Sequence, residues 1–81
     1  MNLSILKIAM TQEQVLQSEF PVSGIYVIEH TVSGKKYVGQ SIDIKRRWND
    51  HIKHSRTRDY YFCRALRKHP PSEWKWSVIS L

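Results

Sequence analysis

The sequence predicts an α+β domain in which helices pack on a small antiparallel or mixed sheet. Residues 24–30 and 35–39 are rich in β-branched and aromatic side chains, and residues 31–34 between them contain a Ser-Gly pair typical of a turn. Two helical patterns follow, and residues 74–81 return to a strand pattern. The order β-β-α-α-β contains no βαβ repeat, which favours α+β over a parallel sheet.

The N-terminal residues are expected to support the core without carrying chemistry. Residues 1–10 fit either a strand or a short helix. A helix is predicted over residues 11–18 because Thr11 and Gln14 have the spacing of a capping box, in which each side chain bonds the other residue's backbone N–H. Pro21 cannot continue that helix.

The first of the two later helices is predicted directly after the second strand. Ser41 or Asp43 is expected to cap it. Ile44, Trp48 and Ile52 recur at four-residue spacing and therefore define one broad side of the helix. We expect this side to face the sheet.

The second helix is predicted over residues 60–68, with Asp59 as its cap and the two prolines at 70 and 71 as its end. The residues expected to pack from this helix are Tyr61 or Phe62, Ala65 and Leu66. In the closing strand the residues expected to share one side are Trp74, Trp76 and Val78.

The chain is basic, and its charge is uneven. The net charge is +6, and residues 35–68 hold eleven of the thirteen Lys and Arg residues against three acidic residues, a net charge of +8 for that segment. Such a block attracts a polyanion, most simply nucleic acid, although a solvated basic surface is the alternative. The candidate nucleic-acid-binding residues are Lys35, Lys36, Lys45, Arg46, Lys53, Arg56, Arg58, Arg64 and Arg67.

Length and cysteine content limit the classes of protein to which this chain can belong. Eighty-one residues make one small domain. We assign residues 23–81 to it and residues 1–22 to an N-terminal extension that packs on its core. A single cysteine, Cys63, excludes an internal disulfide and is expected to be a small buried residue. No run approaches the roughly 18 apolar residues of a membrane span, so we expect a cytoplasmic protein.

Two tyrosines lie on the two paired strands. Side chains alternate along a strand, and residues paired across strands point the same way. Tyr26 and Tyr37 therefore share a face only if the numbers of paired residues add up to an odd number, and a slip of one residue would separate them. In isolation each tyrosine is more often a half-buried packing residue than a functional one.

Arg47 and His51 could complete a site with these phenols. They are one helical turn apart and therefore lie on the same side of the first of the two later helices. An imidazole beside a phenol can take its proton, and the phenolate can then deprotonate water. A guanidinium stabilises negative charge growing on a phosphate. The alternative for Arg47 and His51 is an ordinary solvated surface.

A zinc site is disfavoured by spacing. The four histidines and one cysteine show no paired ligand spacing. His69, which precedes two prolines, is interpreted as a loop residue.

The ordered set of motifs resembles the GIY-YIG nuclease domain. The resemblance begins with Gly24-Ile25-Tyr26, continues through the variant second tripeptide Tyr37-Val38-Gly39, and includes Arg47 and His51 at the expected spacing. It covers most of the chain, from residue 23 to residue 81.

The resemblance implies a three-stranded antiparallel sheet flanked by helices. It also implies hydrolysis of phosphodiester bonds, usually in DNA, with Mg²⁺ or Mn²⁺ as cofactor. Carried over to this chain, Tyr26 would activate water with the help of His51. Tyr37 would position the water or the phosphate, and Arg47 would bind the scissile phosphate.

One departure from the family concerns the metal. The family's metal ligand is a glutamate on a helix after the third strand, and neither Glu29 nor Glu73 matches that position. The metal ligand therefore stays unassigned, and a shortened domain, a metal held in another way or a domain that does not cut would each explain the difference. The sequence leaves two hypotheses, a DNA-cutting nuclease and a binding or regulatory module of the same fold that has lost activity.

Overall fold

The structure is a computed structural model, and it describes residues 7–57 and 61–81. Its elements in chain order are β1 (Met10–Thr11), α1 (Gln12–Gln17), β2 (Gly24–His30), β3 (Lys36–Ser41), α2 (Ile44–Ser55), α3 (Tyr61–Lys68), the short 3₁₀ helix η2 (Pro71–Glu73) and β4 (Trp74–Ser80). The predicted α+β class is confirmed.

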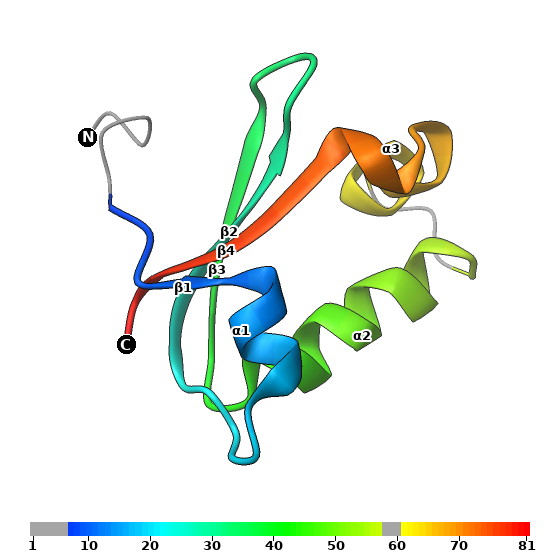
Figure 1. The fold of residues 1–81 in the computed structure, drawn as a ribbon. Coiled ribbons are helices and arrows are strands. Elements are labelled where there is room, and N and C mark those ends of the chain that lie inside the picture. Colours follow the sequence, from blue (N-terminus) through cyan, green and yellow to red (C-terminus); the bar gives the residue numbers. More distant parts are fainter. Residues whose placement is uncertain (1–6, 58–60) are drawn as a thin grey trace.

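The described sheet is antiparallel with strand order β1-β4-β2-β3. The three predicted strands form its centre and one edge. The expected strand number was wrong by one, because Met10 and Thr11 pair with Val78 and Ser77 of β4 and add a fourth, two-residue strand. Figure 1 shows this strand beside β4, with the three α-helices on one side of the sheet.

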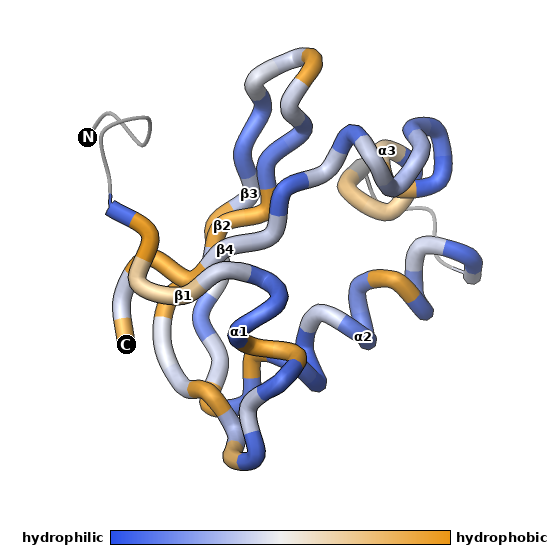
Figure 2. Tube along the Cα trace, in the orientation of Figure 1, coloured by the Kyte–Doolittle hydropathy of each residue, from blue (hydrophilic) through white to orange (hydrophobic). Residues whose placement is uncertain are grey.

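The core lies between the sheet and the helices. Alternate residues of β2 and β4 point toward the helices, and Figure 2 shows strongly apolar residues in β2. Val15 of α1 is fully buried among them. The buried core cluster consists of Val15, Val22, Tyr26, Ile28, Ile44, Trp48, Trp74, Trp76 and Val78. Where the N-terminal extension ends and the domain begins stays a prediction.

Two predicted caps can be compared with the structure. Thr11 accepts from Gln14 N at 3.3 Å, and Gln14 Oε1 accepts from Thr11 N at 2.9 Å, so the capping box is confirmed. Of the two alternatives at α2, Asp43 is the cap, because its Oδ1 accepts from Arg46 N at 3.2 Å. Ser41 Oγ instead accepts from Asp43 N. Asp59 lies outside the described residues.

The packing side of α2 differs from the prediction at its end. Ile44 and Trp48 are buried, but Ile52 is 44% exposed, so its assignment to the packing side was wrong. Residues eight positions apart lie about 80° from each other around the axis of an α-helix, so Ile52 is turned away from the side that carries Ile44. Ser55, eleven residues after Ile44, lies on the buried side again. Its hydroxyl donates a hydrogen bond to Ile52 O at 2.6 Å. On α3, the predicted packing residues Phe62, Ala65 and Leu66 do pack against the core.

Candidate active site

Tyr26 is placed by the sheet. It lies on β2 directly opposite Gly39 of β3, and Tyr37 lies opposite Ile28. The paired numbers add up to 65, an odd number, so the prediction that Tyr26 and Tyr37 share a face is confirmed. That face is the one covered by the helices, and Tyr26 is only 4% exposed.

A steric requirement explains why position 39, in the second tripeptide, is a glycine. A Cβ added to Gly39 would overlap Cζ and Oη of Tyr26, so the hydroxyl end of the phenol occupies the space beside the Gly39 backbone. Gly39 does not have a positive φ, which means that the close approach alone requires glycine here. The sequence motif contained this glycine, but only the strand register shows which ring it accommodates.

Tyr26 and His51 meet across the gap between the sheet and α2. Tyr26 Oη lies 2.9 Å from His51 Nε2, within hydrogen-bond distance. Trp48, one turn earlier on α2, presents its ring edge-on to Tyr26 with a centroid separation of 6.1 Å. These contacts hold the hydroxyl end of the phenol at the imidazole, so the structure brings together two of the four candidate site residues.

His51 is held toward its neutral form. Burial lowers the pKa of His51 below its ordinary value of 6.5, and the positive charge of Arg47 lowers it further. Asp50 opposes this effect and His54 adds to it. A neutral imidazole can accept a proton from the Tyr26 hydroxyl, whereas an imidazolium cannot.

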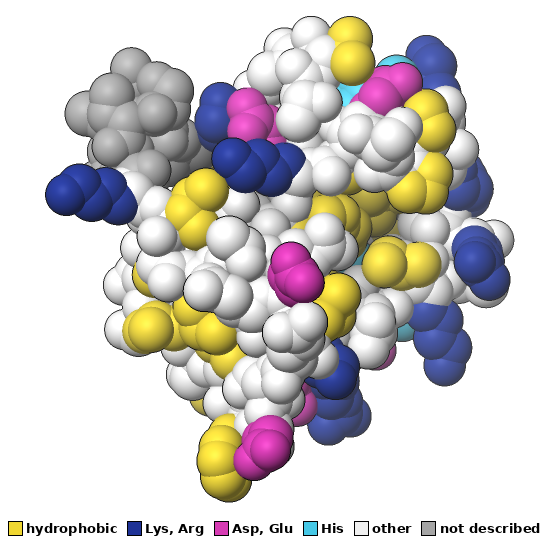
Figure 3. All heavy atoms as spheres, in the orientation of Figure 1, with side chains coloured by type: hydrophobic (Ala, Val, Ile, Leu, Met, Phe, Trp, Pro, Cys, Tyr) yellow, Lys and Arg dark blue, Asp and Glu magenta, His cyan; other side chains and the backbone are white. Residues whose placement is uncertain are grey.

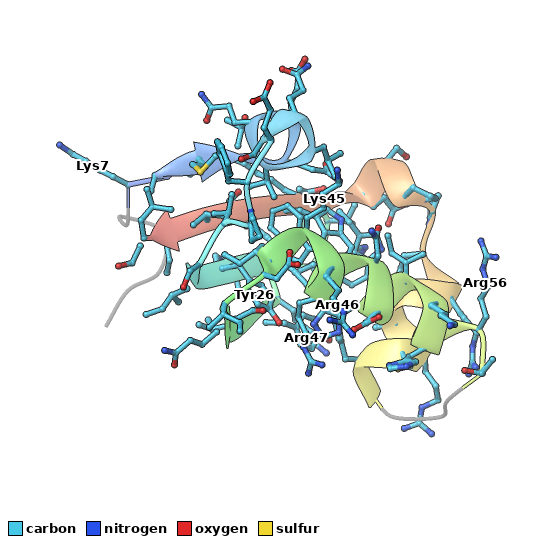
Figure 4. The ribbon with its side chains drawn as sticks, turned by 90° about the horizontal axis from the view of Figure 1, so that it is seen from below. Lys7, Tyr26, Lys45, Arg46, Arg47 and Arg56 are labelled. Atoms are coloured by element: carbon cyan, nitrogen blue, oxygen red, sulfur yellow. The ribbon has the colours of Figure 1, made fainter. Side chains whose placement is uncertain are left out.

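Arg47 lies on the exposed flank of the pair. It occupies the turn of α2 before His51, and its side chain is exposed. Figure 4 shows Arg46 and Arg47 along α2, on the same side of the helix as the labelled Tyr26. Arg47 also lines a shallow hollow of about 400 Å³ together with Arg46, Asp43 and Asp50. The Arg47 guanidinium is therefore open to a ligand that approaches this side of α2 from solvent.

Tyr37 joins the site through an aromatic neighbour. Its ring stacks on Phe62 of α3 with a centroid separation of 4.1 Å, and the same Phe62 lies 5.2 Å from the His51 ring. Phe62 thus contacts both predicted site residues. The sequence predicted Phe62 only as a possible packing residue, because its closeness to His51 depends on how α3 packs against α2.

The basic residues predicted to bind nucleic acid lie on three described elements. Lys35 and Lys36 lie at the β2–β3 turn, where Lys36 pairs with Glu29 at 3.4 Å. Figure 3 shows Lys and Arg side chains along the right-hand edge, over α2 and α3. The exposed candidates on these helices are Lys45, Arg46, Lys53 and Arg56 on α2 and Arg64 and Arg67 on α3. Arg58 lies outside the described residues.

Lys45 differs from the other basic residues of α2. Its Nζ donates to Leu16 O of α1 at 3.2 Å, and Figure 4 shows it on the side of α2 opposite Arg46 and Arg47. Lys45 therefore ties two helices together. Its role in nucleic-acid binding stays a prediction.

The GIY-YIG catalytic domain family matches residues 22–79, which is more than half of the chain. The chain belongs to the GIY-YIG family. No curated protein and no solved structure gives a significant match. Membership of the GIY-YIG family makes this a nuclease-type domain, and nucleases of this family generally use divalent metal ions.

The described residues do not fit a magnesium site beside Tyr26 and His51. Magnesium prefers oxygen ligands and normally takes one or two carboxylates. Of the nearby carboxylates, Asp43 caps α2, and Asp50 lies one position before His51 on the helix. In residues 7–57 and 61–81, the one cluster with metal-ligand geometry is His30, His69 and Glu73, in which two ligand atoms are nitrogen. We therefore derive no catalytic step through magnesium.

Across the two described segments, no helix has the length and apolar character needed to cross a membrane.

Proposed function

We propose that this GIY-YIG domain hydrolyses phosphodiester bonds in DNA, with Tyr26, Tyr37, Arg47 and His51 as its catalytic residues. The observation that carries the proposal is the contact of 2.9 Å between Tyr26 Oη and His51 Nε2 inside the segment that matches the family. Burial of His51 supports the proposal because it favours the neutral imidazole that the chemistry needs.

The proton path follows from this contact. Neutral His51 accepts the Tyr26 proton at Nε2, and the resulting phenolate takes a proton from a water molecule. The water oxygen then attacks phosphorus, and the bond to the leaving oxygen breaks. His51 holds the first proton as imidazolium, from which it can return to solvent or to the leaving oxygen.

Arg47 and Tyr37 supply positioning and charge. Negative charge grows on the phosphate oxygens during attack, and the planar Arg47 guanidinium can donate two parallel hydrogen bonds to them. Its exposure allows a phosphate of a long polymer to reach it. Tyr37, held against Phe62, would position the water or the phosphate on the same face of the sheet.

DNA is the proposed substrate because the exposed basic residues of α2 and α3 lie on the helices that cover the Tyr26–His51 pair. A duplex carries one negative charge per roughly 1.7 Å of its axis, so a basic surface of this kind holds it without reading sequence. Mg²⁺ or Mn²⁺ is proposed as cofactor on the ground of family membership alone, because the described residues beside Tyr26 and His51 offer no fitting set of protein ligands.

The experiment is nicking of supercoiled plasmid under single-turnover conditions with Mg²⁺, with Mn²⁺ and with a chelator. Tyr26→Phe removes only the hydroxyl and keeps the ring on Gly39, and it should lower the rate by about 10²–10⁴-fold. Arg47→Ala should also lower the rate strongly. Arg46→Ala is the matched control for Arg47→Ala, since it removes the same charge from the adjacent position.

Two outcomes would contradict the proposal. Cleavage that survives both Tyr26→Phe and Arg47→Ala would show that the assigned residues are not the site. If neither metal supports cutting while DNA binding persists with a steep salt dependence, the chain is a binding module of the same fold.

A further inference from the structure

A second cluster of functional side chains lies at the other end of β2. His30 is the last residue of β2, His69 follows α3, and Glu73 is the last residue of η2. His30 is four residues from Tyr26, roughly 13 Å along the strand. The proposed mechanism uses none of these three residues, which we call the His–His–Glu cluster.

The ligand atoms of the cluster already converge. One ligand atom from each residue lies within 4.8 Å of the other two. His69 Nδ1 is 3.5 Å from Glu73 Oε1, and His30 Nε2 is 2.8 Å from the same oxygen. Two ligands of a tetrahedral zinc ion with bonds of about 2.1 Å lie about 3.4 Å apart. The first separation matches this value, and the second, which is a hydrogen bond, would lengthen by about 0.6 Å when an ion replaces the proton.

The buried member of the cluster is oriented by a neighbour. His30 is 4% exposed, and its Nδ1 lies 2.8 Å from Ser33 Oγ. Without an ion, Nε2–H of His30 donates to Glu73 Oε1 at 2.8 Å. When an ion displaces that proton, Nδ1–H can donate to the Ser33 hydroxyl, and Nε2 then offers its lone pair to the ion. A metal-binding histidine commonly donates its other N–H in this way to an outer partner.

The backbone fixes Glu73 in place. Thr31 donates to Glu73 O from both its backbone N, at 2.8 Å, and its hydroxyl, at 3.0 Å. Trp74, the next residue, pairs with His30 across β2 and β4. These contacts hold the Glu73 backbone beside the end of β2 before any ion arrives. The rings of His30 and His69 stack with a centroid separation of 4.1 Å, so the exposed His69 ring would turn to direct its nitrogen at an ion.

We propose that His30, His69 and Glu73 bind one Zn²⁺ ion. Two imidazole nitrogens and one carboxylate suit zinc, whereas magnesium selects oxygen ligands. The side chains of His69 and Glu73 are 33% and 30% exposed, so an ion can enter from solvent. A hollow of about 240 Å³, lined in part by His30, His69 and Tyr37, lies beside the two histidines, and water from it would complete the coordination of the ion.

The test uses the whole chain without a histidine tag, freed of metal by a chelator and titrated with Co²⁺ and then with Zn²⁺. Wild-type protein should bind one Co²⁺ with the visible absorption of tetrahedral cobalt, and Zn²⁺ should displace it. His69→Gln and Glu73→Gln should each weaken binding by about 100-fold or more, the upper end of what loss of an outer partner costs. His54→Gln, a half-buried histidine of α2 outside the cluster, should bind as wild type does.

Metal binding is measured without any nuclease assay, so the zinc proposal can fail while the proposed function stands. No binding by wild-type protein, or equal binding by wild type, His69→Gln and Glu73→Gln, would overturn the proposal. NMR supplies a second measurement on the unaltered chain. The imidazole protons of His30 and His69 should shift on addition of one equivalent of Zn²⁺ while those of His54 stay, and the reverse pattern would also overturn it.

Discussion

Gly39 and Tyr26 face each other across the β2–β3 pair, and the absence of a side chain on the first makes room for the ring of the second. This contact sets the height of the phenol above the sheet. The height in turn decides whether Tyr26 Oη reaches His51 Nε2 on α2.

Gly39→Ala should therefore separate the Tyr26–His51 pair. The added methyl group forces the buried ring to move, and overpacking of this kind costs about 1–3 kcal/mol of unfolding free energy. We expect a lower melting temperature and loss of the hydrogen bond, read from the NMR signals of the His51 ring. Gly34→Asn is the control, because Gly34 has φ +77° and nothing within 4 Å, and asparagine tolerates that backbone. Equal signals from the His51 ring in wild type and Gly39→Ala would contradict this account.

The protonation of His51 should give the protein an acid-sensitive site. Because the pKa of His51 is lowered in the folded state, the unfolded chain takes up the proton first as pH falls through 6.5. The unfolded state then binds more protons, so this group's contribution to stability falls as pH drops from 6.5 to the lowered pKa. Nicking should fall over the acid side of the same range, as imidazolium cannot accept the phenol proton. The NMR titration of the His51 ring measures the pKa directly.

Arg47→Ala should raise the pKa of His51 toward 6.5, since it removes a neighbouring positive charge. If Arg47→Ala keeps some nicking activity, the loss of that activity at acidic pH should begin at a higher pH, in step with the raised pKa of His51. Arg56→Ala removes an equal charge from the C-terminal end of α2 and should leave the His51 titration in place. A midpoint for wild-type His51 at or above 6.5 would refute the assigned cause.

The cap of α2 should matter for stability, and a matched pair of variants isolates it. Asp43→Ala removes the acceptor for Arg46 N and should cost about 1 kcal/mol of unfolding free energy. Asp43→Asn keeps a capping oxygen and loses only the charge, so it should cost less. Urea denaturation measures both. Equal losses for the two variants would assign the effect to charge.

The basic side of α2 should bind DNA through phosphates. Lys53 and Arg56 are exposed, and loss of one phosphate contact lowers the slope of log affinity against log salt by about 0.9. Lys53→Ala and Arg56→Ala should each reduce the slope by this amount and weaken binding to all sequences alike. Lys7→Ala is the control, because Lys7 precedes β1 and lies at the opposite end of the molecule from Arg56 of α2 in Figure 4. A salt slope that is unchanged in both helix variants would place the DNA elsewhere.

Local patterns were sufficient for most elements of the fold. The alternation in β2 and β4, the turn before β3, the capping box at Thr11 and the apolar spacing of Ile44 and Trp48 depend on residues close together in sequence. The same local rules predicted that Arg47 and His51 share a side of α2. They failed at Ile52, where the helical phase had drifted, and for β1, whose two residues become a strand only by pairing with β4.

The sequence by itself determined the α+β class, the nuclease family and the basic charge, and it indicated Tyr26, Tyr37, Arg47 and His51 as the candidate catalytic residues. Tertiary structure alone decided that Gly39 accommodates the Tyr26 ring, that Phe62 contacts both His51 and Tyr37, and that His30 meets His69 and Glu73. The spacing argument against zinc missed the last of these. His30 and Glu73 are 43 residues apart, and only the antiparallel pairing of β2 with β4 brings them together.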